Sequence, residues 1–324
     1  MRLRHSLKIA STSMSRNFLR IGSRGSRLAL WQAEQAKARL VELSPGLLVE
    51  IEIIKTTGDV KSDPLSVIGG KGVFTKEIEE ALLDKRIDIA VHSLKDLPTI
   101  VPDGLTISAI GEREDPRDAL VLRKDVRAAS VSDLPVGAVV GTSSQRRMAQ
   151  LKALRGDLII KDLRGNVDTR VRKLDEGKYE ALILASAGLI RLGLRDRISG
   201  AVSINEILPA VGQGAIAIET RADDEVTVAA ANKLNHRPTE LACRAERAFL
   251  RGLGGGCQFP IAAHALIEGD VLKLEGLVAK PDGSEILRGT SSGTAEDGEV
   301  IGAALAARLI DQGAGSLLSG QQHG

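Results

Sequence analysis

The chain has very few aromatic residues and almost no cysteine. Its 324 residues include four Phe, one Tyr and one Trp. The hydrophobic cores must therefore be built from Leu, Ile, Val and Ala. Single-stranded nucleic-acid binding needs aromatic rings on which bases stack, so this class is not expected. The only two cysteines, Cys243 and Cys257, cannot form a disulfide framework in so long a chain, and they suit a reducing compartment.

A strong excess of charge of one sign and a long hydrophobic run are also missing. The formal net charge is only +2, so no whole-protein field favours DNA or a membrane surface. No apolar run approaches the length of a membrane span. His and Cys residues with metal-ligand spacing are absent, and so is a nucleophile-elbow serine motif. We therefore expect no nucleic-acid, membrane or metal partner, and any anion site must concentrate positive charge locally.

The first nineteen residues form a basic extension. They contain several serines, no acidic residue and four basic ones, Arg2, Arg4, Lys8 and Arg16. Without a continuous apolar run they do not resemble a secretory signal. An organellar transit peptide is one interpretation. A disordered tail, or a true start at Met14, is the simpler one, and a cytoplasmic location follows from it.

From residue 20 to about residue 220, short apolar runs alternate with helical stretches. The predicted strands are residues 19–22, 48–54, 87–91, 138–140, 158–160, 181–184 and 215–218. The predicted helices are residues 27–43, 75–86, 144–154 and 166–176. This alternation indicates α/β units with largely parallel sheets, in one sheet or two. Residues 111–116, before a strand at 119–122, are predicted to cross into a second domain.

After Pro238 the pattern changes. A helix at 239–251 leads into Gly254-Gly255-Gly256-Cys257. Three strand-like runs follow, at 261–267, 271–279 and 284–290, joined by turns that contain Gly, Pro and Asp. A last helix runs from 298 to about 312. These elements predict a small antiparallel α+β domain.

A strand end, a turn of small polar residues and a helix start with arginines recur together. This junction occurs at residues 22–26, at 141–147 and at 163–166, where Arg170 follows one turn later. Helix N-termini bind anions, and arginine matches a carboxylate bidentately. Helix capping with solvated arginines would explain any one junction. Three of them favour a multiply anionic ligand, and the missing P-loop spacing favours a polycarboxylate over a nucleotide.

Three further segments are candidates for chemistry. Lys95 and Asp96 follow a strand end, where they suit acid–base or cation-stabilising work, or form an ordinary ion pair. His92 is expected to pack or cap locally. The Gly-rich stretch 56–72 is either a lid or disordered. Cys257 follows three glycines and is a candidate covalent site, whereas Cys243 lies within the predicted helix and suits a buried position.

Eight stretches, in order, resemble one family. They are residues 24–32 (RGSRLALWQ), 69–74 (GGKGVF), 92–98 (HSLKDLP), 112–118 (EREDPRD), 141–147 (GTSSQRR), 163–170 (LRGNVDTR), 209–214 (PAVGQG) and 255–258 (GGCQ). Together they resemble the hydroxymethylbilane synthase (porphobilinogen deaminase) family. The resemblance covers nearly everything after residue 19.

The resemblance implies an α/β fold with two lobes like those of type II periplasmic binding proteins, and an active site between them. A small C-terminal α+β domain with a three-stranded antiparallel sheet follows. We expect the first domain at 20–114 and 215–236, the second at 115–214 and the third at 237–324.

The resemblance also implies an activity. Such a transferase joins four porphobilinogen molecules head to tail with loss of ammonia, then releases linear hydroxymethylbilane by hydrolysis. The product grows on a dipyrromethane cofactor held by a thioether, here to Cys257. A cytoplasmic monomer is expected.

The matching positions imply roles. Asp96 is the expected catalytic carboxylate, facing pyrrole N–H groups. The expected cofactor-binding residues are Cys257, Lys95, Asp96, Thr142, Ser144, Arg146, Arg147, Arg164, Gly165 and Arg170. The expected substrate-binding residues are Arg24, Ser26, Gln32, Lys71, Phe74, Arg164, Arg170, Arg191 and Gln213.

The chain departs from the family at Val67, where the lid often carries a lysine, and at the Gly-rich approach to Cys257. Two other classes share the two-lobe architecture. A binding protein for small polyanions would have an export signal, and a transcriptional regulator would have a helix-turn-helix. The sequence shows neither feature.

Overall fold

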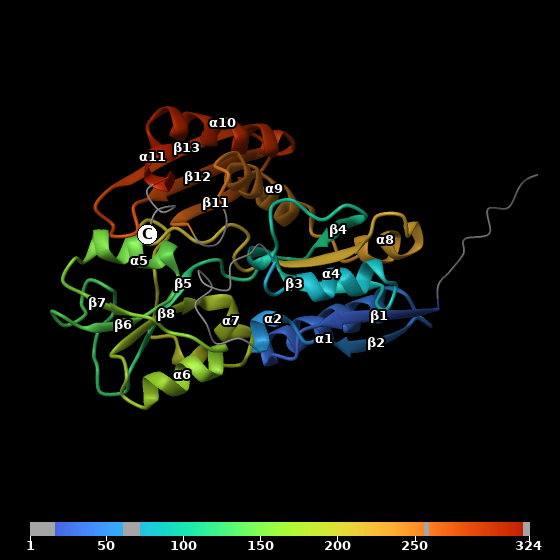
Figure 1. Ribbon diagram of the computed structural model, residues 1–324, viewed down its shortest axis with the longest axis horizontal. Coiled ribbons are helices and arrows are strands. Elements are labelled where there is room, and N and C mark those ends of the chain that lie inside the picture. Colours follow the sequence, from blue (N-terminus) through green and yellow to red (C-terminus); the bar gives the residue numbers. More distant parts are fainter. Residues whose placement is uncertain (1–16, 61–71, 256–258, 320–324) are drawn as a thin grey trace, which may run out of the picture.

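The computed structural model describes residues 17–60, 72–255 and 259–319 (Figure 1). The described chain builds three sheets. Two of them have five strands each and helices on both faces, and the third has three strands and helices on one side. No helix within the described ranges is long and apolar enough to cross a bilayer.

The first lobe is the sheet β2-β1-β3-β10-β4 with its helices. Its strands are β1 (Phe18–Ser23), β2 (Leu48–Ile53), β3 (Ile89–Ser93), β4 (Leu105–Ile110) and β10 (Ile216–Arg221). Helices α1 (Arg27–Leu43) and α8 (Glu225–Asn232) cover one face, and α4 (Lys76–Leu83) covers the other. In β3, Ile89 and Val91 face α1 while Ala90 faces α4, as the two-residue period of a strand requires. The short α2 (Thr57–Val60) follows β2.

The second lobe is the sheet β7-β6-β8-β5-β9 with its helices. Its strands are β5 (Asp118–Leu122), β6 (Val139–Gly141), β7 (Ile159–Lys161), β8 (Ala181–Ala185) and β9 (Gly200–Ala201). Helix α5 (Gln145–Leu154) packs on one face, and α6 (Val167–Asp175) and α7 (Ser186–Arg191) pack on the other. A 3₁₀ turn, η2 (Arg195–Arg197), precedes β9.

The sheets are largely parallel, as predicted, but each contains one strand that runs against the other four, so both sheets are mixed. Strand β10 runs antiparallel to β3 and β4, and β5 runs antiparallel to β8 and β9. The cause lies in the two crossings between the lobes. The outgoing crossing is residues 111–117, between β4 and β5, and the return crossing is residues 202–215, between β9 and β10. Each crossing enters its new sheet at the edge where the parallel strands end, so Asp118 starts β5 beside Ala185, the last residue of β8. The strand that follows a crossing must therefore run antiparallel to the strands beside it.

The third sheet is antiparallel, as predicted, in the order β11-β12-β13. Its strands are β11 (Ile261–Glu268), β12 (Val271–Ala279) and β13 (Ile286–Thr294). The helices of this part are α9 (Arg237–Gly252), α10 (Gly298–Asp311) and α11 (Ala314–Ser319), with the turn η3 (Ala295–Asp297) before α10.

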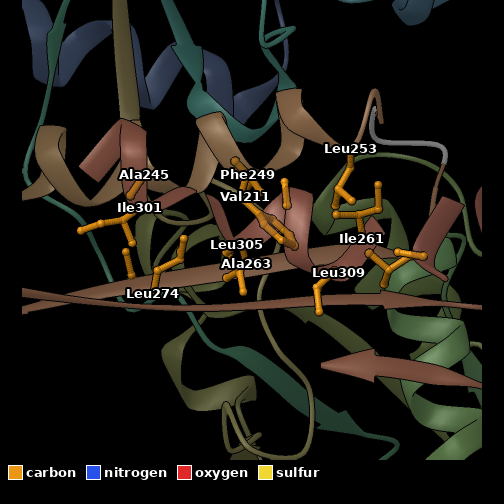
Figure 2. Packing of buried hydrophobic residues seen from close by; sticks show 14 of the residues in the cluster. Val211, Ala245, Phe249, Leu253, Ile261, Ala263, Leu274, Ile301, Leu305 and Leu309 are labelled. Carbon is orange, nitrogen blue, oxygen red and sulfur yellow. The ribbon is translucent and has the colours of Figure 1, made fainter. Parts of the chain in front are cut away.

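The core of this third part is centred on Phe249 of α9 (Figure 2). Leu274 and Ala263 from the sheet and Leu305 from α10 belong to the same cluster. Gly276 leaves room for the ring, since a Cβ at that position would lie 2.5 Å from it. Val211 also joins this cluster, although it belongs to the segment that returns from the second lobe to the first.

One buried carboxylate joins the three parts of the molecule. Glu246 of α9 accepts from Arg113 Nη1 at 2.5 Å and Nη2 at 3.2 Å. It also accepts from the backbone N–H groups of Gly212 at 2.7 Å and Ala265 at 2.8 Å. Arg113 lies in the outgoing crossing, Gly212 in the return crossing and Ala265 in β11. Glu246 therefore ties both crossings to the third sheet.

Glu246→Gln should destabilise the protein strongly. The variant keeps the side-chain shape but leaves the Arg113 guanidinium, only 10% exposed, without its counter-charge. Breaking a buried ion pair costs about 3–5 kcal/mol. Glu299→Gln is the matched control, because its pair with Arg251 is largely exposed and should contribute about 1 kcal/mol or less. Urea unfolding compares the two variants, and equal midpoints would contradict the importance of Glu246.

Candidate active site

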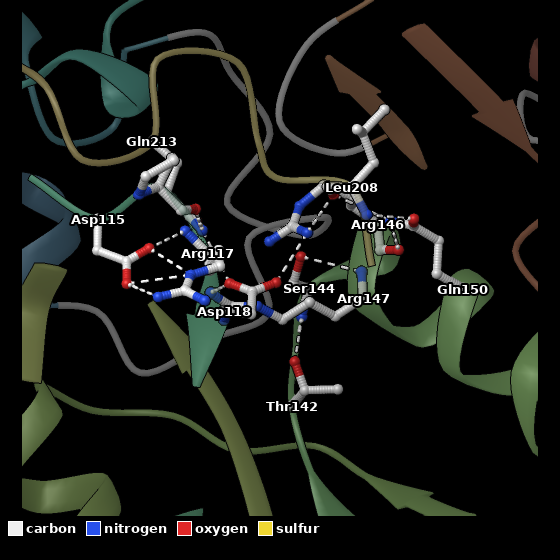
Figure 3. A network of polar contacts seen from close by, with 11 residues as sticks. Asp115, Arg117, Asp118, Thr142, Ser144, Arg146, Arg147, Gln150, Leu208 and Gln213 are labelled. Atoms are coloured by element: carbon white, nitrogen blue, oxygen red, sulfur yellow. Dashed lines mark hydrogen bonds and ion pairs between the residues drawn. The ribbon is translucent and has the colours of Figure 1, made fainter. Parts of the chain in front are cut away.

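The centre of the candidate site is Asp118, the first residue of β5 (Figure 3). Its carboxylate is fully buried and lies 2.9 Å from Arg146 Nη1 and 2.7 Å from Arg147 Nη2. Gln213 Nε2 donates to the same carboxylate at 2.8 Å. Burial alone would raise the pKa of Asp118, but the two guanidinium groups hold it well below its usual range. Asp118 is therefore an anion throughout the physiological pH range.

Arg146 and Arg147 are adjacent at the start of α5, and both are buried. The same Nη1 of Arg146 that contacts Asp118 also donates to the carbonyl of Leu208 at 2.7 Å. Gln150 Nε2 donates to the same carbonyl at 3.2 Å, and Gln150 Oε1 accepts from Leu208 N at 2.7 Å. The guanidinium of Arg146 is thus locked between α5, β5 and the return crossing.

Some buried polar atoms around Asp118 have no hydrogen-bond partner within the described part of the chain. They are Arg147 Nε, Gln213 Oε1 and Ser186 Oγ. Buried polar groups are almost always paired, so unpaired ones mark a place where a polar ligand completes the network. A donor such as Arg147 Nε suits a carboxylate.

Lys95 and Asp96 occupy a 3₁₀ turn, η1 (Leu94–Asp96), directly after β3. Asp96 is exposed and Lys95 is half-buried. Burial and the charges of Arg147 and Arg146 lower the pKa of Lys95 to about 8, against the opposing attraction of Asp96 and Asp118. The end of β3 in the first lobe therefore lies close to Arg146 and Arg147 of the second lobe.

The third predicted junction joins the same region. Arg170 Nε donates to the carbonyl of Gly165 at 2.7 Å, and Arg164 pairs with Asp162 at 2.8 Å. Burial and the charge of Arg147 lower the pKa of Arg170 to about 10, with Asp96 among the groups that act in the opposite direction. We call Lys95, Arg146, Arg147 and Arg170 the cationic cluster.

The hydroxyl residues at these junctions act as local caps. Ser26 Oγ accepts from Ala29 N at 3.3 Å at the start of α1. Ser144 Oγ accepts from Arg147 N at 3.5 Å at the start of α5, and Thr142 Oγ1 accepts from Ser144 N at 3.3 Å. The capping interpretation is therefore confirmed for Ser26 and Ser144, while the buried arginines beside Ser144 contradict simple solvation.

The first lobe contributes other predicted residues. The Arg24 guanidinium lies 4.2 Å from the centre of the Phe74 ring. Gln32 Nε2 donates to Ser93 Oγ at 2.9 Å, which ties α1 to the end of β3. Arg191 of α7 donates to the carbonyl of Gly214 at 2.6 Å and lies 5.6 Å from the centre of the Trp31 ring.

His92 packs locally, as expected. Its Nε2 lies 3.0 Å from Glu219 Oε2, and both side chains are buried beneath α4. Cys243 is fully buried in α9, and burial raises the pKa of its thiol to about 12. Cys257, Lys71 and Val67 lie outside the described residues.

Sequence reasoning missed Asp118 and Ser186. Asp118 appears in the sequence only as the last residue of a charged run, 112–118, and reads as a solvated acid. The available signal is its position, since it directly precedes the apolar run 119–122 and so starts a buried strand.

Two family models match the chain. One is described as porphobilinogen deaminase, dipyromethane cofactor binding domain, and matches residues 19–229. The other is described as porphobilinogen deaminase, C-terminal domain, and matches residues 240–311. The first match ends within α8, and the second begins within α9.

Solved structures of binding proteins show a weaker likeness. A TRAP periplasmic solute binding protein from Desulfovibrio salexigens is 12% identical, with a TM-score of 0.41 over 67% of this chain and 72% of that one. The L-cystine solute receptor of Neisseria gonorrhoeae is 11% identical, with a TM-score of 0.39 over 67% and 84%. A mutant ArgBP from T. maritima is 16% identical, with a TM-score of 0.35 over 67% and 87%.

Asp96→Asn should lower the pKa of Lys95 further below about 8, because the variant removes the attraction of the neighbouring carboxylate. Nitrogen NMR of the lysine side chains measures this pKa, and Lys95→Arg identifies the signal. Asp103→Asn, in the exposed connection after β3, is the matched control and should leave the value unchanged. A Lys95 pKa near the ordinary 10.5 in the unsubstituted chain would contradict the burial of this amine among cations.

Proposed function

The chain belongs to the porphobilinogen deaminase family, and on this premise we propose that the cationic cluster holds the carboxylates of its cofactor and of the growing product. The family makes the chain a transferase with hydroxymethylbilane synthase activity in tetrapyrrole biosynthesis. Its cofactor is dipyrromethane, and its substrate is the small molecule porphobilinogen.

The residues around Asp118 fit such a cofactor. Each pyrrole unit carries an acetate and a propionate, so two linked units bring four carboxylates. Arginines are the side chains best suited to bind them, and Arg147 Nε is a buried donor without a partner among the described residues. This unpaired donor is the observation that carries the proposal. When bound, the cofactor supplies the terminal pyrrole to which the next unit is joined.

The proposed binding residues divide by position. Toward the cofactor we place Cys257 as the covalent anchor, with Lys95, Asp96, Thr142, Ser144, Arg146, Arg147, Arg164, Gly165 and Arg170. Toward the substrate we place Arg24, Ser26, Gln32, Lys71, Phe74, Arg191 and Gln213, with Arg164 and Arg170 shared. Phe74 and Arg24 form one contact in the first lobe, which supports their joint assignment.

Asp96 is the proposed catalytic residue. Its carboxylate is exposed at the end of β3 and adjoins Lys95, and it lies near enough to Arg170 to influence its pKa. An acceptor in this position can bind pyrrole N–H groups and stabilise the positive charge that develops as ammonia leaves. It can also take up or return the proton that each addition moves. Lys95 and Arg170 place positive charge close to this carboxylate.

The remaining proposals concern organisation. We place the domains at 20–114 with 215–236, at 115–214 and at 237–324. The pairing of β10 with β3 and β4 supports the return of the chain to the first domain. We also propose a cytoplasmic monomer. Phe18 and Leu19 belong to β1 and not to the expected N-terminal extension, because both pair with β2.

Intact mass should show two pyrrole units on Cys257. The active chain is expected to be heavier than its polypeptide by one dipyrromethane, and Cys257→Ala should lose that mass together with activity. Cys243→Ala is the control and should keep both, since burial leaves this thiol unreactive. An active chain with the bare polypeptide mass would exclude the covalent role.

Asp96→Asn should keep the fold and the adduct but lose kcat by about a hundred-fold or more, because it removes charge stabilisation at the reacting atoms. Steady-state turnover of porphobilinogen measures the loss, and Asp103→Asn provides the control. If the Asn variant turns over within a few-fold of the unsubstituted chain, Asp96 is only an ion-pair partner.

A further inference from the structure

We propose that Asp118 is a positioning residue, which aims Arg146 and Arg147 at the cofactor carboxylates and fixes both arginines relative to the domain that bears the cofactor. This inference rests on the proposed function and assigns a role to a residue that binds neither cofactor nor substrate directly.

The first support is geometric. The two Asp118 oxygens are divided between the two arginines, with Oδ2 at 2.9 Å from Arg146 and Oδ1 at 2.7 Å from Arg147 (Figure 3). Arg147 is bound through Nη2 only, which leaves its buried Nε without a partner among the described residues. Asp118 therefore fixes the orientation of the guanidinium while it leaves a donor for a ligand.

The second support is electrostatic. Arg146 and Arg147 are adjacent and buried, and Lys95 and Arg170 are close enough to feel their charge. Like charges at such distances repel strongly where water is excluded. The charge of Asp118 opposes this repulsion at Arg146 and at Lys95. Without it the two arginines would tend to separate, and Lys95 would hold its proton less tightly.

The third support is the connection to the rest of the molecule. Gln213 Nε2 donates to Asp118 and, at 2.7 Å, to the carbonyl of Pro116. The Gln213 carbonyl accepts from Arg113 Nε at 2.8 Å, and Arg113 pairs with Glu246 of α9. A continuous chain of hydrogen bonds thus runs from the arginines through both crossings to the third sheet. Through it, the arginines keep a fixed position relative to the helix that leads to Cys257.

The test compares three variants of the full chain. Asp118→Asn removes the charge, Asp118→Glu keeps the charge but displaces the carboxylate, and Asp115→Asn is the control in the same crossing. Asp115 pairs instead with the largely exposed Arg117, at 2.7 Å. Urea unfolding first establishes which variants fold. Intact mass then gives the fraction of each that carries the adduct, both as produced and during incubation with porphobilinogen.

We expect Asp118→Asn to form the adduct about ten- to a hundred-fold more slowly, the equivalent of one charged hydrogen bond. In the small fraction that carries the adduct, the fall of activity at alkaline pH should begin at a lower pH. The reason is that the charge of Asp118 raises the pKa of Lys95, and the variant removes that charge. Asp118→Glu should restore the pH at which activity falls on the alkaline side, but it should restore only part of the rate of adduct formation. Asp115→Asn should match the unsubstituted chain in every measurement.

The proposal would be overturned if Asp118→Asn formed the adduct as fast as Asp115→Asn and lost activity at the same alkaline pH. If Asp118→Asn does not fold, Asp118→Glu decides, since normal loading with a displaced carboxylate would equally overturn it. An unsubstituted active chain without any adduct would instead overturn the proposed cofactor site, and this inference with it. Slow loading confined to the Asp118 variants supports both.

Discussion

The arrangement of the whole molecule depends on the carboxylate of Glu246. Four hydrogen bonds converge on it from the outgoing crossing, the return crossing and β11. The two lobes are joined only by the outgoing and return crossings, and two single chain segments do not fix the orientation of one lobe relative to the other. Because Glu246 is fully buried, each of its bonds forms where water cannot compete. This contact helps to set the position of the third sheet relative to the lobes, together with the packing of Ala149 of α5 against Ala262 and Leu277 of that sheet.

The crossings can pass so closely because of glycine. Gly214 has a φ of +90°, and a Cβ there would lie 2.3 Å from the carbonyl oxygen of Glu114 in the other crossing. Its own carbonyl accepts from Glu114 N and from Arg191, so the two crossings bind each other as well as Glu246. The charged site is therefore built on backbone contacts that only this residue permits.

The six aromatic residues are used sparingly. Phe249 fills the third core, while Phe74 and Trp31 lie against arginines near the proposed site. Tyr179 joins a core of the second lobe, and otherwise aliphatic side chains and alanine fill most of the interior, as the composition predicts. Arg146 and Arg147 are correspondingly buried, with Asp118 as their shared counter-charge. Such a site favours a ligand that brings several carboxylates, since each one neutralises a charge that is costly to keep buried alone.

The sequence by itself determined the family, most of the elements and most of the charged residues of the proposed site, but it did not predict β4, α7 or α8. The bounds of α1 agree with the prediction. The motif residues Lys95, Arg146 and Arg170 follow strand ends, Lys95 in the first lobe and both arginines in the second, and they lie close together where the two lobes meet. Tertiary structure decided the rest. Neither the direction of β5 and β10 nor the burial of Asp118 can be read from local pattern, because both depend on where the crossings enter the sheets. Strand periodicity marks a buried face, but only the assembled lobes show that an acid after Pro116 is enclosed by two arginines.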